Sequence, residues 1–145
     1  EYSEAVIDWH ERDLLPDTAG LAADDRVTLV CADFFAAAMN PTGFDPDSPG
    51  RTYDAILLDI DHSPAHVLHD PHAAFYSREG LESAAAHLVP GGVFAMWSDD
   101  APDDDFVSLL DAVFTAVEAQ QIWFDNPLTR DRSAATIYLA TRAHG

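Results

Sequence analysis

Two aspartates, Asp59 and Asp61, directly follow a short apolar run, and this placement favours chemistry on a bound ligand. The run is Ala55–Leu58, within the sequence YDAILLDIDHSP that covers Tyr53–Pro64. An unbroken apolar run bounded by turn-forming residues is typical of a strand buried on both faces of a parallel sheet. Ligands of open α/β sheets bind at the carboxyl ends of strands. The two carboxylates are therefore predicted to lie where a bound ligand would undergo chemistry.

Four histidines follow in the polar connection Ile60–Ala74: His62, His66, His69 and His72. The last three are spaced by three, so on a helix they would share one face and could bind a metal. The connection also contains two prolines, which favour a loop. We therefore interpret it as a polar lid over the cleft and expect no metal.

Composition narrows the class of protein. The 145 residues are enough for one domain with a real core, and 48% are hydrophobic. The net charge is −19, and the chain contains no lysine. A surface this acidic repels nucleic acid and anionic membranes, which argues against both as partners. The acids are spread along the chain, which favours a role in solubility over a field for a cationic substrate. With no membrane-length apolar run, no signal peptide and one cysteine, the expected location is cytoplasmic.

The helices and strands that position these residues are predicted from the spacing of the hydrophobic residues and from the proline, glycine and capping residues that end such segments. The predicted helical segments are Glu1–Leu15 before Pro16, Phe34–Met39, Ser77–Leu88 with Ser77 as its cap, and Asp103–Ala119. The predicted strands are Arg26–Cys31, Asp54–Asp59, Val93–Trp97, Gln121–Phe124 and Ala135–Thr141. Turns are expected at Pro90–Gly92 and Asn126–Ser133. Cys31, Trp9, Trp97 and Trp123 are expected in the core.

Alternating strands and helices predict an α/β fold. We expect a Rossmann-like, doubly wound and mostly parallel sheet. The last two strands are joined by a short link without a helix, so they should form an antiparallel hairpin at the C-terminus.

Three stretches carry a resemblance to a known family. They are EYSEAVIDWHERDLLP at the start, YDAILLDIDHSP in the middle, and FYSREGLESAAAHLVPGGVFAMW after it. Together they resemble the C-terminal portion of the class I S-adenosylmethionine-dependent methyltransferase fold, and within it the spermidine synthase-like branch. The resemblance implies that the family's first strand and Gly-rich loop lie upstream of Glu1. Residues 1–145 would then be the C-terminal part of a single domain, with weakened or absent cofactor binding on their own.

The resemblance also implies roles for single residues. Glu1 would take both ribose hydroxyls of an S-adenosylmethionine-type nucleoside, and Asp33 would receive the adenine amino group, with Ala32 and Phe34 near the ring. From the residues alone, Glu1 could equally be an acid favoured at a helix start, and Asp33 a helix cap.

On the acceptor side, Asp59 would hold the attacking amine and help to remove its proton, with Asp61 as a candidate second anchor and Tyr76 beside the substrate. The alternatives are that both acids cap loops and that Tyr76 belongs to the core. The acidic loop departs from the family pattern, because it has one more residue before Pro64.

The function that follows is aminopropyl transfer from decarboxylated S-adenosylmethionine to a small-molecule amine, releasing methylthioadenosine. The alternatives are methyl transfer from S-adenosylmethionine to another small acceptor, and a non-catalytic remnant that pairs with another subunit. The sequence is compatible with a homodimer but does not determine the oligomeric state.

Overall fold

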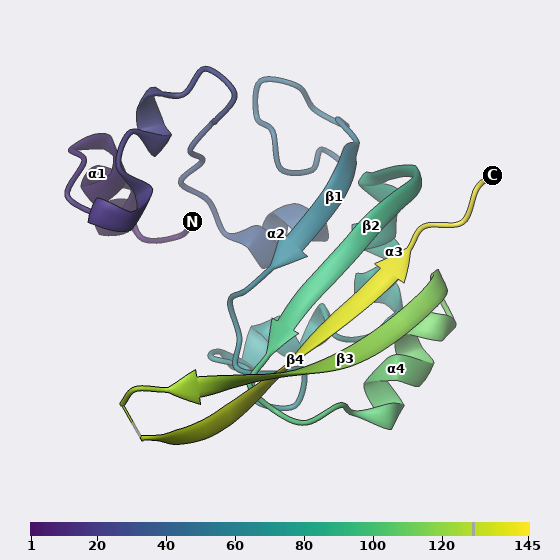
Figure 1. Ribbon diagram of the computed structural model, residues 1–145. Helices are drawn as coiled ribbons and strands as arrows, with labels where there is room; N and C mark the ends of the chain where they lie inside the picture. The colour runs from purple at the N-terminus through teal and green to yellow at the C-terminus, as the bar shows by residue number, and fades with distance from the viewer. Residues whose placement is uncertain (129) are drawn as a thin grey trace.

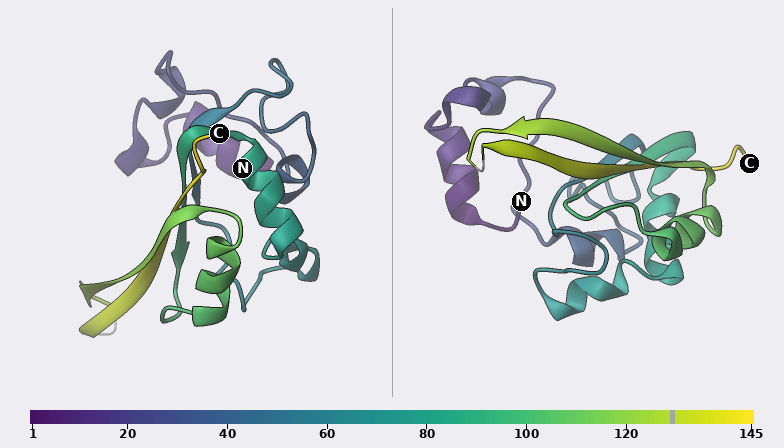
Figure 2. Two further views of the ribbon diagram at one scale, coloured as in Figure 1. Left: turned by 90° about the vertical axis from the view of Figure 1, so that its right-hand side faces the viewer. Right: turned by 60° about the horizontal axis from the view of Figure 1, so that its bottom comes forward.

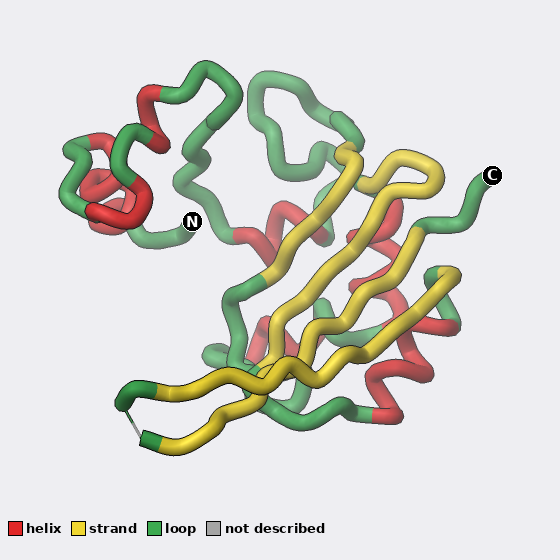
Figure 3. The backbone as a smooth tube through the Cα atoms, in the orientation of Figure 1, coloured by secondary structure: helices red, strands yellow, loops and turns green. Residues whose placement is uncertain are grey.

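Four strands form one twisted sheet in the order β1-β2-β4-β3 (Figures 1 and 3). The structure, a computed structural model, describes residues 1–128 and 130–145. The strands are β1 (Tyr53–Leu58), β2 (Leu88–Ser98), β3 (Thr115–Asn126) and β4 (Asp131–Thr141). β1 and β2 are parallel, whereas β4 is antiparallel to both β2 and β3. The predicted α/β fold and C-terminal antiparallel hairpin are confirmed.

The helices are shorter than the sequence predicts. They are α1 (Glu4–Glu11), α2 (Phe34–Ala38), α3 (Arg78–Ala86) and α4 (Asp104–Asp111), with single 3₁₀ turns η1 (Pro16–Thr18), η2 (Leu21–Ala23) and η3 (Asp70–Ala74). Ser77 caps α3 as predicted, since its side chain accepts a hydrogen bond from Gly80 N. Asp103 caps α4 in the same way, accepting from Asp105 N and Phe106 N.

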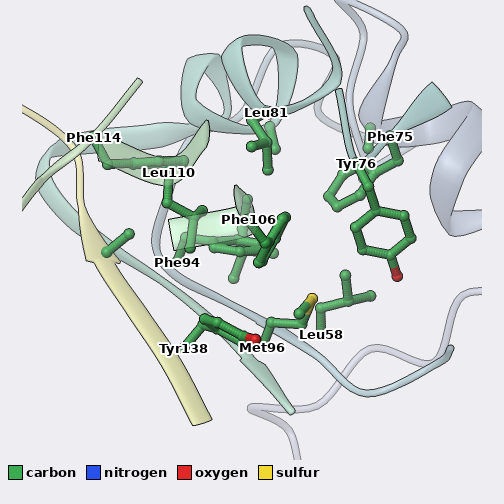
Figure 4. Close-up of a cluster of buried hydrophobic side chains, with 14 of the residues drawn as sticks. Leu58, Phe75, Tyr76, Leu81, Phe94, Met96, Phe106, Leu110, Phe114 and Tyr138 are labelled. Carbon is green, nitrogen blue, oxygen red and sulfur yellow. The ribbon is translucent and has the colours of Figure 1, made fainter. Parts of the chain in front are cut away.

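One face of the sheet carries the core. Ile56 and Leu58 of β1, Phe94 and Met96 of β2 and Tyr138 of β4 are buried on this face. α3 and α4 cover it (Figure 2), with Leu81 and Leu110 fully buried beneath them. Figure 4 shows Leu58, Phe94, Met96 and Tyr138 from the sheet gathered with Leu81 and Leu110 in one cluster of aromatic and aliphatic side chains.

The opposite face is not buried at β1, contrary to the prediction of a strand covered on both faces. Leu57 is 77% exposed, and its neighbours across the sheet in register, Ala95 of β2 and Leu139 of β4, are only half-buried. The apolar run is therefore real, but the described chain supplies a helix layer for one face of it only. Trp9 and Trp123 are also exposed and Trp97 half-buried, so the core prediction for them is wrong or incomplete.

Two predicted elements change type. Arg26–Cys31 is extended but belongs to no strand of the described residues, since its backbone partners are Asp24 before it and the single residue Glu1, not a neighbouring strand. Cys31 is exposed. The helix predicted over Asp103–Ala119 ends at Asp111, and from Thr115 the chain joins β3. Pairing with β4 here overrides a helical hydrophobic period, as tertiary contacts often do.

Two turns also differ from expectation. Pro90–Gly92 lies inside β2, where it forms a bulge: the register with β1 shifts between Tyr53 and Ala55, and Gly91 has a φ of 80°. The turn predicted at Asn126–Ser133 is shorter, since β4 begins at Asp131, and it includes residue 129, which lies outside the described residues.

Among the helices of the described residues, none combines the length and the apolar character that crossing a membrane requires.

Candidate functional site

A groove of about 530 Å³ lies along the open edge of β1. The extended segment 26–32 forms its other wall, and α2 contributes residues from its first turns. Because β1 is the outermost strand of the sheet, its outer backbone groups face this groove. The volume is in the range of pockets that hold small molecules. The lining residues are Glu1, Arg26, Thr28, Val30, Ala32, Phe34, Ala37, Phe44, Asp45, Arg51, Tyr53, Ala55, Ile56 and Leu57.

Three of the four predicted nucleoside residues, Glu1, Ala32 and Phe34, line this one groove. A short backbone pairing brings the first two together: Glu1 N donates to Val30 O at 3.1 Å, and Ala32 N donates to Glu1 O at 2.9 Å. One carboxylate oxygen of Glu1 accepts a hydrogen bond from Ser3 N at 2.7 Å, which orients the side chain. Glu1 thus lies in the same groove as Ala32 and Phe34, although it precedes them by 31 and 33 positions in the sequence.

α2 sets the aromatic wall of the groove. Asp33 caps this helix, accepting a hydrogen bond from Ala36 N at 3.1 Å, so the capping role considered for it is present. The next residue, Phe34, stacks on Phe44 with centroids 5.1 Å apart and planes 17° apart. The result is a flat apolar surface at the groove, which is the type of surface that accepts a purine ring.

The two aspartates after β1 have opposite environments, and neither lines the groove. Asp59 is exposed at the carboxyl end of the strand. The Asp61 side chain is fully buried. Its carboxylate accepts hydrogen bonds from Leu68 N at 2.7 Å, His72 Nδ1 at 2.9 Å and Tyr76 Oη at 2.9 Å. Asp61 therefore ties the acidic loop to the segment before α3.

Tyr76 belongs to this internal network. Its ring packs among Phe35, Phe75 and Phe106, and the side chain is buried. Burial, reinforced by the Asp61 carboxylate, raises the pKa of the Tyr76 hydroxyl, so the group stays protonated and donates. Of the two interpretations of Tyr76, the core position is the one that its surroundings match.

His72 is the residue of this network that sequence reasoning missed. It is placed by η3 and stacks on Phe35 with centroids 3.9 Å apart. Its Nδ1 faces Asp61, so the segment predicted as a polar lid is partly an internal support. Nothing in the spacing of the histidines signals this, because the contact joins residues 11 positions apart through an irregular loop.

A second polar contact joins the ends of β1 and β2. His66 Nδ1 lies 2.7 Å from Asp100 Oδ2 and 3.3 Å from the Ser63 hydroxyl. Hydrogen bonds from Ser63 and then His66 lower the pKa of the Asp100 carboxyl. No group of three metal-ligating side chains gathers in residues 1–128 and 130–145.

Comparison by sequence identifies no relative: no protein family model matches the chain, and no curated protein does.

Comparison by structure does identify similar folds. Human methyltransferase-like protein 13, in complex with SAH, matches 99% of the chain with a TM-score of 0.68 at 20% identity. A protein of Thermoplasma acidophilum described as a methyltransferase matches 100% of the chain with a TM-score of 0.60 at 18% identity. The N-methyltransferase NodS from Bradyrhizobium japonicum WM9, also with SAH, matches 90% with a TM-score of 0.52 at 14% identity.

These likenesses show that the chain has the α/β fold of class I methyltransferases. The chain spans only 59%, 56% and 64% of the lengths of these three structures. None of the three is named as an aminopropyltransferase, and the spermidine synthase-like branch stays a prediction.

Proposed function

We propose that the chain belongs to an S-adenosylmethionine-dependent methyltransferase that acts on a small-molecule acceptor. The observation that carries this proposal is the gathering of Glu1, Ala32 and Phe34 on one groove of a fold shared with SAH-bound methyltransferases. Aminopropyl transfer, the main expectation from sequence, has no such support, so methyl transfer takes its place. The net charge of −19 argues against nucleic acid or an anionic membrane as acceptor.

The side chains suit the parts of the nucleoside. The Glu1 carboxylate only accepts hydrogen bonds, so it can receive two ribose hydroxyls side by side. Phe34 and Ala32 line the groove and would contact the adenine ring. Asp33, between them in the sequence, would receive the adenine amino group through the carboxylate oxygen that does not cap α2. When bound, S-adenosylmethionine would supply an electrophilic methyl group on a sulfonium that is already a good leaving group. The protein would therefore mainly hold and orient the reactants.

Asp59 is the proposed acceptor-side residue. It is exposed at the carboxyl end of β1, where ligands of α/β sheets bind, whereas the buried Asp61 is fully occupied by internal donors. A carboxylate at this point can hold an acceptor and take its proton. Asp61 would act by fixing the loop that carries Asp59.

We also propose that residues 1–145 form the C-terminal part of one methyltransferase-like domain, completed by an upstream strand and Gly-rich loop. Support comes from β1: its edge is open, and Leu57 on its second face is 77% exposed in an apolar run suited to burial. Burying a leucine side chain stabilises a protein by about 1.5–3 kcal/mol, so packing of a further element against this face of β1 would be favourable. The segment 26–32, on the far side of the groove, likewise has no strand beside it within the described chain.

A longer chain tests this domain proposal. A protein that includes the natural sequence upstream of Glu1 should bind S-adenosylmethionine at least about 100-fold more tightly than residues 1–145, because the missing strand and loop complete the site. Calorimetric titration of both chains measures the difference, and hydrogen exchange should show new protection of the β1 backbone. Equal affinities and an unprotected β1 edge would contradict the proposal.

Ligand preference tests the reaction. The longer chain should bind S-adenosylmethionine and SAH in preference to decarboxylated S-adenosylmethionine and methylthioadenosine. Glu1→Gln should weaken the binding of all four nucleosides by about 10–100-fold, since it removes charge-assisted bonds to the ribose. The control is Glu4→Gln, which neutralises another exposed acid three residues away and should leave affinity unchanged. A preference for the decarboxylated form would restore the aminopropyl hypothesis.

A further inference from the structure

The hairpin of β3 and β4 projects beyond the rest of the sheet (Figures 1 and 2). Of the residues of β4, only Thr136–Thr141 pair with β2. The distal part, Ile122–Asn126 paired with Asp131–Ala135, is therefore a ribbon of two strands with no third strand beside it. Such a ribbon is only marginally stable in water by itself, so an additional strand would stabilise it.

The outer edge of this ribbon lacks the usual protection against pairing. β3 is the last strand of the sheet, so one edge of it is open within the described residues. Ile122, Trp123 and Phe124 are 46%, 54% and 44% exposed. Edge strands usually carry charges or proline that prevent pairing with another strand. From Gln120 to Phe124 this edge has neither.

Charge distinguishes this surface from the rest of the chain. Residues 120–134 contain two aspartates and two arginines, which cancel, whereas the whole chain carries −19. Arg132 is held over the Trp123 ring, 5.4 Å from its centroid, so the positive charge lies close to the apolar residues. Two copies of the chain repel each other through most of their surfaces but not through this hairpin.

We propose that two copies of the chain form a symmetric dimer by antiparallel pairing of their β3 edges, with Ile122 opposite Ile122 on the two-fold axis. In this register the uncharged run Gln120–Phe124 pairs along its whole length with the same run of the second copy. Glu118 then lies opposite Asn126, and Asp125 opposite Ala119, so no acid faces an acid across the two strands. An edge that pairs with itself is the simplest route to closed two-fold symmetry.

Sedimentation equilibrium tests the dimer, and Ile122→Lys tests the edge. The wild-type chain should be dimeric at micromolar concentration. The lysine should raise the dimer dissociation constant about 100-fold, because each copy contributes one lysine to the interface and each lysine weakens the dimer roughly tenfold. Leu68→Lys is the control, since Leu68 is similarly exposed (51%) and belongs to no strand of the sheet. A monomeric wild type, or a dimer that Ile122→Lys leaves intact, would overturn the proposal.

A disulfide tests the register without relying on the lysine variant folding. In a Cys31→Ser background, Ile122→Cys should form an intermolecular disulfide under mild oxidation, because paired Cα atoms across antiparallel strands are about 4.5–5.5 Å apart. Leu68→Cys in the same background should not. Equal and slow cross-linking of both variants would show that the β3 edges do not meet.

Discussion

Replacing Asp61 with alanine should lower the free energy of unfolding by about 3–5 kcal/mol, the largest loss expected of any single acid in this chain. The Asp61 side chain is fully buried and holds three donors: the Leu68 backbone N–H, His72 Nδ1 and the Tyr76 hydroxyl. Alanine would leave all three without this acceptor, and the buried Tyr76 hydroxyl is the donor least able to regain a partner from water. Urea unfolding followed by tryptophan fluorescence measures the change.

Matched variants separate this network from a general effect of charge. Asp59→Asn, two residues away but exposed, should change stability by no more than about 0.5 kcal/mol. Tyr76→Phe should cost about 1–3 kcal/mol, and the double variant with Asp61→Ala should lose less than the sum, because both substitutions break the same hydrogen bond. An Asp61→Ala protein as stable as Asp59→Asn would show that the buried carboxylate does not support the loop.

The contrast between Asp59 and Asp61 shows how far sequence could predict the candidate site. A short apolar run followed by acids was enough to predict β1 and the position of both aspartates at its carboxyl end. The period of two along a strand does not extend into an irregular loop, so nothing in the sequence indicated that Asp61 turns inward while Asp59 stays in solvent. That difference depends on Leu68, His72 and Tyr76, which reach Asp61 only through tertiary folding.

The fold was predicted best where local signals and packing agree. Ser77 and Asp103 cap helices that begin where the sequence predicts, because a side-chain cap acts within one turn. The predicted end of α4 was wrong because Phe114 and Val117 continue a helical hydrophobic period, yet from Thr115 the chain belongs to β3, which pairs with β4. The strand predicted at Arg26–Cys31 was wrong for the opposite reason. Its residues favour a strand, but a strand also needs a neighbouring strand to pair with, which the described chain does not provide.

Asp59→Asn should reduce methyl transfer by about 10²–10⁴-fold while leaving nucleoside affinity nearly unchanged. Asparagine keeps the shape of the side chain but cannot take a proton, so the loss isolates the proposed role of the carboxylate on the acceptor side. Formation of SAH from S-adenosylmethionine with a panel of small primary amines measures turnover, and calorimetric titration of SAH measures affinity. Both are best measured on the chain extended upstream of Glu1, where the groove is expected to be complete.

The control for this experiment lies at the other end of the same strand. Asp54 is also an exposed aspartate, but it precedes the apolar run of β1 and so faces away from the carboxyl ends of the strands. Asp54→Asn should therefore leave turnover within about twofold of the wild type. Unchanged turnover in Asp59→Asn would remove Asp59 from the mechanism and leave the nucleoside groove as the only assigned part of the site. Equal losses in both variants would point instead to the summed negative field of the chain as what attracts the acceptor.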